Sequence, residues 1–160
     1  MTYQTTNPYT GEVVTTFATA TGAEVDAAIT KADSAFRTWR DTPVPERLRV
    51  LARAADLLEA SGREYAEILT LEMGKLIGEA EAEVALCTGM LRYYVRNAAE
   101  QLAPRFLPAA GYGDTDVRLV AEPQGVLYAV EPWNFPFYQV VRIGAPQLAA
   151  DNTLVLKHAS

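Results

Sequence analysis

The fold of this chain is decided between residues 125 and 156, where the sequence is GVLYAVEPWNFPFYQVVRIGAPQLAADNTLVL. The β-branched and aromatic run at 125–130 predicts a strand. Apolar residues at helical spacing predict a helix over 137–150. Residues 153–156 are apolar without interruption, which predicts a second strand, buried on both faces of a parallel sheet. A strand, a helix and a strand in this order form a crossover unit, so the fold class is α/β.

The chain before this unit has a helical pattern over most of its first two thirds. Thr21-Gly-Ala-Glu24 has the form of a capping box and predicts the start of an amphipathic helix. Pro43 and Pro45 predict the start of a second helix, and Gly74 the end of a third. A fourth, longer helix is predicted by the apolar stripe from Ile77 to Ala98. Further along, 117–121 and 125–130 are two β-rich runs around a turn and predict a hairpin.

Composition excludes several classes of protein. The 160 residues are 49% hydrophobic and carry 14 Lys and Arg against 20 Asp and Glu, a net charge of −6. This charge has the wrong sign for binding nucleic acid through the whole surface. No apolar run approaches the roughly 20 residues that cross a membrane, and no secretory signal is present at Met1–Pro8. With a single cysteine, we expect a cytoplasmic protein without disulfides.

Conventional motifs for cofactors and metals are absent from the sequence. Gly111-Tyr-Gly113 lacks the third glycine of a dinucleotide fingerprint. The one histidine, His158, excludes a multi-histidine metal site and is expected to be a polar residue just past a strand. Cys87 lies on the apolar stripe of the fourth helix and is expected to be buried and inert. The glutamates at 79, 81 and 83 have the pattern of a solvated helix face.

One segment, Glu131-Pro-Trp-Asn-Phe-Pro-Phe137, stands out at the junction of a strand and a helix. Two interpretations are open. In the first, Asn134 caps the helix, since asparagine is a leading cap residue and proline suits the first helical turn. In the second, the prolines hold the Asn134 amide at the carboxyl end of a strand, where open α/β sheets bind ligands. An amide there could donate a hydrogen bond to a developing oxyanion.

This segment, together with Asn152-Thr-Leu-Val-Leu-Lys-His-Ala-Ser160, resembles the aldehyde dehydrogenase superfamily, in its succinate-semialdehyde dehydrogenase-like branch. The resemblance extends over nearly the whole chain, through the motifs Asn7-Pro-Tyr-Thr-Gly-Glu12, Leu71-Glu-Met-Gly-Lys75 and Glu122-Pro-Gln-Gly-Val126. It implies the amino-terminal part of a Rossmann-type cofactor domain. The implied enzyme oxidises an aldehyde to an acid with NADP or NAD, and its predicted hairpin would be an arm through which subunits form a homo-oligomer.

The resemblance assigns a role to each matching residue. Asn134 matches the oxyanion donor, whose amide holds the alkoxide formed when a cysteine thiolate attacks the aldehyde. Pro132 and Trp133 match positions that line the cofactor cleft, and Lys157 matches a lysine that binds the adenosine ribose. Without the resemblance, Lys157 would be interpreted as a solvated charge at a strand end. Ser160 stands where many NAD-preferring relatives have a glutamate, and a serine there removes a charge that repels a 2′-phosphate.

The remaining candidate site residues lie in the predicted helix after this segment. Helical spacing places Arg142 on the same face as Phe135 and Tyr138. In the family this face lines the substrate tunnel, and a guanidinium there suits the distal carboxylate of a short semialdehyde, the implied small-molecule substrate. An exposed helix arginine fits the spacing equally well, and the resemblance favours the substrate contact.

The resemblance also implies what these residues do not contain. Residues 1–160 correspond to an incomplete NAD(P)-binding domain with a hairpin at 116–131 as the oligomerisation arm, and the catalytic domain is absent. The family's nucleophilic cysteine and its activating glutamate have no counterpart here. We therefore expect either a fragment of an active enzyme or an inactive truncated chain that serves as a binding or oligomerisation module. A polypeptide of these 160 residues is expected to lack dehydrogenase activity.

Overall fold

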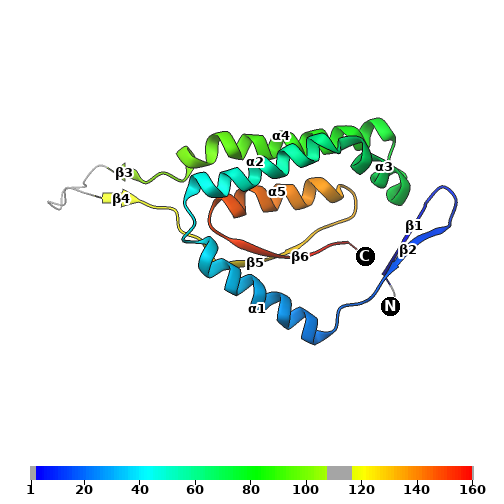
Figure 1. The fold of residues 1–160 in the computed structure, drawn as a ribbon, viewed down its shortest axis with the longest axis horizontal. Coiled ribbons are helices and arrows are strands. Elements are labelled where there is room, and N and C mark those ends of the chain that lie inside the picture. Colours follow the sequence, from blue (N-terminus) through cyan, green and yellow to red (C-terminus); the bar gives the residue numbers. More distant parts are fainter. Residues whose placement is uncertain (1–2, 108–116, 160) are drawn as a thin grey trace.

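The computed structural model describes residues 3–107 and 117–159. Within them the chain forms five helices and six strands (Figure 1). In chain order these are β1 (Tyr3–Thr6), β2 (Val13–Phe17), α1 (Gly22–Trp39), α2 (Val44–Ala60), α3 (Gly62–Met73), α4 (Ile77–Gln101), β3 (Arg105–Leu107), β4 (Val117–Leu119), β5 (Val126–Val130), α5 (Pro136–Ala149) and β6 (Thr153–Lys157).

The crossover unit predicted from the sequence is confirmed. Strands β5 and β6 pair in parallel, in register from Val126 opposite Thr153 to Val130 opposite Lys157. Helix α5 connects them, packs against β6, and continues through Pro146 to its end. Helix α1 contacts the strands as well, and Figure 1 shows it on the opposite side of the sheet from α5. Two strands do not define a strand order, so the Rossmann-type assignment stays a prediction.

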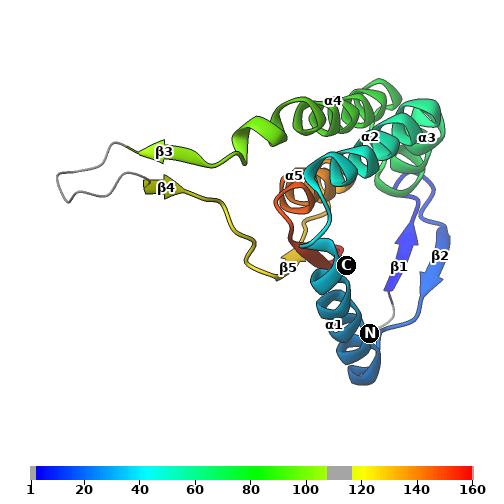
Figure 2. The same cartoon turned by 60° about the vertical axis from the view of Figure 1, so that its left-hand side comes forward.

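The helices before this unit form a second layer over α5. Helices α2 and α4 both pack against α5, as Figures 1 and 2 show. A single apolar cluster joins the three helices, with Leu51 from α2, Leu91 from α4 and Ala145 from α5 among its buried members. Burial of this kind stabilises by about 25 cal/mol per Å² of apolar surface. Helix α5 is therefore the central element, held between the sheet and the helical layer.

Two of the predicted helix boundaries have clear local causes. Thr21 and Glu24 form the predicted capping box, each side chain bonding the backbone of the other residue. Helix α3 ends at Gly74, whose φ of +69° lies in the left-handed region. A side chain at Gly74 would also bring a Cβ within 2.8 Å of Pro8 Cγ. Glycine is therefore favoured at position 74 both by the left-handed backbone conformation and by the short distance to Pro8.

Side chains from other helices hold the end of α5 and the start of the sheet. The indole N–H of Trp39 donates to the carbonyl of Leu148 at 2.9 Å, and buried Arg47 donates to that of Ala149 at 3.1 Å. Buried Asn152 accepts from the backbone N–H groups of Gln124 at 2.7 Å and Gly125 at 2.9 Å. These bonds fix the end of α5 and join the starts of the two parallel strands.

The predicted hairpin between 117–121 and 125–130 is wrong. Strand β4 pairs antiparallel with β3, with Arg105 opposite Leu119 and Leu107 opposite Val117. Strand β5 pairs with β6 instead. The predicted pair of β4 and β5 does not form because β5 belongs to the parallel unit. Strand β4 therefore pairs with β3, which precedes it in the chain. Figures 1 and 2 show β3 and β4 extending away from the helical layer. The predicted interval 116–131 includes residue 116, outside the described residues.

No helix in the part of the chain that the structure describes is long and apolar enough to cross a membrane.

The exposed apolar side of β5 generates a prediction about self-association. Tyr128 is 68% exposed and Val130 61%, and strand alternation places both on one side of the strand. We expect a polypeptide of these 160 residues to self-associate through this strand, because exposed apolar strands and unpaired edges favour association. Size-exclusion chromatography should show concentration-dependent oligomers that Tyr128→Lys reduces and the control Leu76→Lys, at a residue 70% exposed on the helical layer, does not. A sharp monomer peak at all concentrations would contradict this.

Candidate functional site

The candidate site is built at the carboxyl edge of the parallel strands. Val130 ends β5 directly opposite Lys157, which ends β6, and the N–H of Glu131 donates to the carbonyl of Lys157 at 3.0 Å. The turn from Pro132 to Asn134 follows at once and is exposed, with Trp133 at 70%. The structure therefore brings the predicted residues of the turn and Lys157 to one edge of the sheet, where open α/β folds bind ligands.

Asn134 does not cap α5, so the first interpretation of its role is wrong. The N-cap residue is Phe135, with φ −144° and ψ 71°, and it makes no side-chain capping bond. Pro136 follows as the first helical residue. The amide of Asn134 is exposed and makes no hydrogen bond within the described residues. Its donors therefore remain available to a ligand.

The first turn of α5 is capped instead by Glu83, a residue of α4. One carboxylate oxygen, Oε1, accepts from the N–H of Phe137 at 3.0 Å and from that of Tyr138 at 3.1 Å. The expectation that Glu83 belongs to a solvated face is wrong, since it is only 2% exposed. The reason is that Glu79 and Glu81 point to solvent while Glu83 faces α5, whose N-terminal N–H groups compensate the burial of its charge.

Lys75 completes this cluster. Its ammonium forms an ion pair with the second oxygen of Glu83, and only 10% of the lysine side chain is exposed. The same ammonium lies 3.7 Å from the centroid of the Phe135 ring, a cation–π contact. A carboxylate at a helix N-terminus takes the place that a phosphate would occupy. The first turn of α5 is therefore filled from within the protein and is closed to a nucleotide phosphate.

A row of side chains runs along one face of α5, as the helical spacing predicts. The rings of Phe135 and Tyr138 meet edge to face with centroids 5.9 Å apart. The guanidinium of Arg142 lies 5.9 Å from the Tyr138 ring centroid and is exposed. Two aromatic rings and a cation in line can accept a short apolar chain that carries a distal anion.

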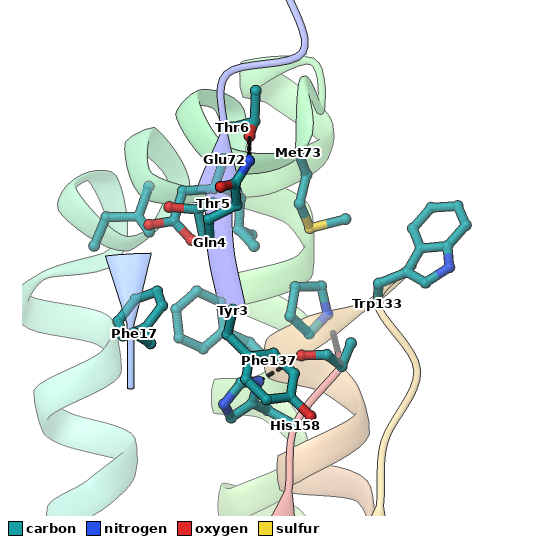
Figure 3. Close-up of a pocket in the computed structure, with 14 residues that line it drawn as sticks. Tyr3, Gln4, Thr5, Thr6, Phe17, Glu72, Met73, Trp133, Phe137 and His158 are labelled. Atoms are coloured by element: carbon teal, nitrogen blue, oxygen red, sulfur yellow. Dashed lines mark hydrogen bonds between the residues drawn. The ribbon is translucent and has the colours of Figure 1, made fainter. Parts of the chain in front are cut away.

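An apolar pocket of about 460 Å³ lies beside this edge (Figure 3). It lies between β1, α3 and the start of α5, with Tyr3, Met73 and Phe137 among its walls. Trp133 lines its rim, and Figure 3 shows the indole pointing away from the other side chains. Glu72 is the carboxylate of the lining. The pocket was not predicted, because its walls come from segments far apart in the sequence.

The last residue of β6 and the residue after it lie next to the amino-terminal strand. The ammonium of Lys157 lies 5.3 Å from the centroid of the Tyr3 ring, and the same ring meets exposed His158 at 5.9 Å. His158 is thus a polar residue past a strand end, as expected. Ser160, the remaining predicted cofactor residue, and Gly111 to Gly113 lie outside the described residues.

Cys87 is buried, as the sequence predicts. It is fully enclosed in α4. Burial raises the pKa of its thiol to about 12, and the negative charge of Glu83 on the previous turn contributes. A thiol that stays protonated at neutral pH is a poor nucleophile. The sole cysteine of these residues is therefore unsuited to attack an aldehyde.

Sequence reasoning missed the two charged residues beneath the site. Lys75 stands in the motif Leu71-Glu-Met-Gly-Lys75, and Glu83 follows it by eight residues on the next helix. The signal that could have found Glu83 is its position on the apolar stripe, one turn before Cys87.

The parallel strand, helix and strand unit places an amide and a lysine at its carboxyl edge, the edge at which open α/β proteins bind ligands. The profile of the aldehyde dehydrogenase family matches residues 1–160. Two relatives are named succinate-semialdehyde dehydrogenase (NADP(+)). The protein of Deinococcus radiodurans is 45% identical over 98% of this chain and 32% of its own length. That of Mycobacterium tuberculosis is 47% identical over 98% of this chain and 34% of its own length.

Solved structures agree with these relatives. A succinic semialdehyde dehydrogenase from Streptococcus pyogenes, in complex with NADP+, superposes with a TM-score of 0.92 at 39% identity, covering 98% of this chain and 34% of the other. One from Burkholderia pseudomallei gives 0.91 at 34% identity, covering 99% and 33%. This chain belongs to the aldehyde dehydrogenase family, as the resemblance implied. It spans about a third of the length of the curated relatives it matches.

The environment of Cys87 predicts its reactivity. Because the thiol is buried and its pKa is about 12, it stays neutral from pH 6 to 9, and a thiol reagent at pH 8 should label it only after unfolding. The same polypeptide should show no turnover of succinate semialdehyde with either cofactor. Labelling kinetics in buffer and in urea test the first statement. Rapid labelling of the folded chain, or turnover that Cys87→Ala abolishes, would contradict the assignment.

Proposed function

We propose that this chain supplies the cofactor-binding edge and the oxyanion donor of an NADP-dependent succinate-semialdehyde dehydrogenase. The observation that supports this most directly is the placement of Asn134 and Lys157 at one carboxyl edge, with the Asn134 amide unused by the helix. The names of the relatives support the substrate and the cofactor. The reaction would oxidise succinate semialdehyde, or a similar aldehyde, to its acid.

The residues at the edge suit a nicotinamide dinucleotide. The exposed indole of Trp133 offers a flat apolar surface beside Pro132, and the Lys157 ammonium can donate to a ribose hydroxyl or to a 2′-phosphate. Ser160 adds a hydroxyl donor without a negative charge, so either NADP or NAD can be accepted. The cofactor, when bound, accepts a hydride. Its pyrophosphate must be held away from α5, because Glu83 occupies that helix N-terminus.

Asn134 would act in the chemical step. When a thiolate adds to an aldehyde, the carbonyl oxygen gains negative charge, and the amide N–H groups of Asn134 can donate to it. Loss of one donor of this kind costs typically about 2.7 to 4 kcal/mol of transition-state stabilisation. The thiolate itself must come from outside these residues, since Cys87 is buried.

Arg142, Tyr138 and Phe135 would bind the substrate. The guanidinium can hold a carboxylate through two parallel hydrogen bonds, while the two rings enclose the short carbon chain. Selection for a semialdehyde then follows from charge, because a neutral aldehyde would leave the guanidinium without its partner.

The hairpin of β3 and β4 is our candidate for the oligomerisation arm. It extends from the body, and Phe106 is exposed with the guanidinium of Arg118 above its ring. A projecting strand pair with an exposed aromatic residue suits contact with a second copy of the chain. We propose a homo-oligomer in the cytoplasm, whose reducing conditions suit the free thiol of Cys87.

The substrate proposal is tested by Arg142→Leu in the full-length protein. The KM for succinate semialdehyde should rise at least about tenfold, because charge-assisted hydrogen bonds are worth roughly 1.5 to 3 kcal/mol, while the KM for a neutral aldehyde of similar length should change little. Arg49→Leu, on the exposed side of α2, is the control and should change neither value. Equal losses for both aldehydes would contradict a carboxylate contact.

The cofactor proposal is tested by Ser160→Glu. The new carboxylate should repel the 2′-phosphate of NADP and bind the ribose hydroxyls of NAD, so the ratio of kcat/KM for NADP to that for NAD should fall. Ser160→Ala, which adds no charge, separates this effect from loss of the hydroxyl. Steady-state kinetics with both cofactors measure it. An unchanged ratio would contradict the role assigned to Ser160 in cofactor preference, and the family assignment would still hold.

A further inference from the structure

The Lys75 and Glu83 pair is joined to the start of α5 through one of the two carboxylate oxygens of Glu83. Oxygen Oε1 of Glu83 accepts from Phe137 and Tyr138, and Oε2 pairs with Lys75. Both side chains are nearly or fully enclosed. Because both oxygens of the Glu83 carboxylate have partners, the first turn of α5 is tied to α4 and to Lys75.

The same pair contacts the residue that precedes the helix. The Lys75 ammonium lies 3.7 Å from the ring centroid of Phe135, the N-cap of α5 and the residue directly after Asn134. Gly74, in the left-handed conformation before Lys75, directs the chain from α3 into this contact. Glu83 thus holds the residues after Pro136, and Lys75 holds the residue before it.

We propose that Lys75 and Glu83 are positioning residues that set the direction of the Asn134 amide, an inference that rests on the proposed function of Asn134. Neither belongs to the predicted site. Asn134 lies in a turn with no side-chain bond of its own within the described residues. Its orientation therefore depends on the two anchored segments beside it, Val130 in the sheet and Phe135 on Lys75.

The expected effect of disturbing the pair is on the chemical step. A displacement of about 1 Å in a positioned group can cost about 10²-fold in rate. Glu83→Gln keeps the shape of the side chain but removes its charge and replaces one acceptor oxygen by an NH₂ donor, so either Lys75 or the N–H groups of α5 lose their acceptor. We expect kcat to fall about tenfold, within that limit, while the KM for the cofactor changes less than about twofold.

A double-mutant cycle in the full-length protein separates positioning from structural damage. Glu83→Gln is made alone and together with Asn134→Ala. If Glu83 acts through Asn134, the tenfold loss should shrink to less than about twofold in the Asn134→Ala background. Equal losses in both backgrounds, or no loss in either, overturn the proposal. The matched control is Glu81→Gln on the same helix, because Glu81 is exposed and pairs with the exposed Arg63 of α3.

Two lysine variants keep the test decisive if Glu83→Gln does not fold. Lys75→Met keeps the aliphatic stem and removes the charge, so it should lower kcat in the same non-additive way. Lys75→Arg keeps a cation for both Glu83 and the Phe135 ring and should restore most of the rate. A loss of kcat in Lys75→Arg equal to that in Lys75→Met would contradict the contact that Lys75 makes.

A second readout does not depend on aldehyde oxidation. Amide hydrogen exchange of residues 131–138 should be faster in Glu83→Gln and Lys75→Met than in the parent protein, and unchanged in Glu81→Gln. If the parent protein oxidises no aldehyde, the proposed function fails and exchange alone decides whether the pair fixes this segment. Unchanged exchange of residues 131–138 in both variants would overturn the positioning role on its own.

Discussion

The arrangement of the candidate site depends on one buried carboxylate. Glu83 reaches from α4 to the first turn of α5, where two backbone N–H groups and Lys75 compensate its charge. Removing one partner of such a buried pair costs typically about 3 to 5 kcal/mol, because the other charge is left without compensation. The interaction serves two purposes. It anchors the helix, and because Glu83 caps the first turn, the side chain of Asn134 is not used as the helix cap.

Each end of α5 contacts a charged side chain whose sign complements the helix dipole. An anion, Glu83, lies at the N-terminal end, and a cation, Arg47, donates to a carbonyl at the C-terminal end. Both charges have the sign that the helix dipole favours at that end. Between them the helix presents Ala145 and Ala149, small buried residues that let α2 and α4 approach closely. Charge therefore fixes the position of α5 along its axis, and shape fixes its distance from its neighbours.

The sequence predicted the features whose causes lie close together in the chain. The capping box at Thr21, the helix end at Gly74 and the crossover from β5 to β6 depend on neighbouring residues or on simple periodicity. The errors have the opposite origin. Glu83 bonds Phe137, 54 residues away, and the partner of β4 was chosen by competition for β5. Burial by a distant helix and choice among strands leave no local signal. Helical spacing could place Phe135, Tyr138 and Arg142 in a row, because all three lie at the N-cap of α5 or within the helix.

Asn152 has a consequence for the site although it lies at the other end of the sheet. Its bonds to Gln124 and Gly125 fix where the parallel ladder starts, and four residue steps later the ladder ends with Val130 opposite Lys157. At about 3.3 Å per residue, that start is about 13 Å from the edge. The two paired strands therefore set a fixed distance between Asn152 and the site. A shift of the strand register by one residue at the Asn152 end would move the Asn134 amide relative to Lys157, although neither of these residues would have been substituted.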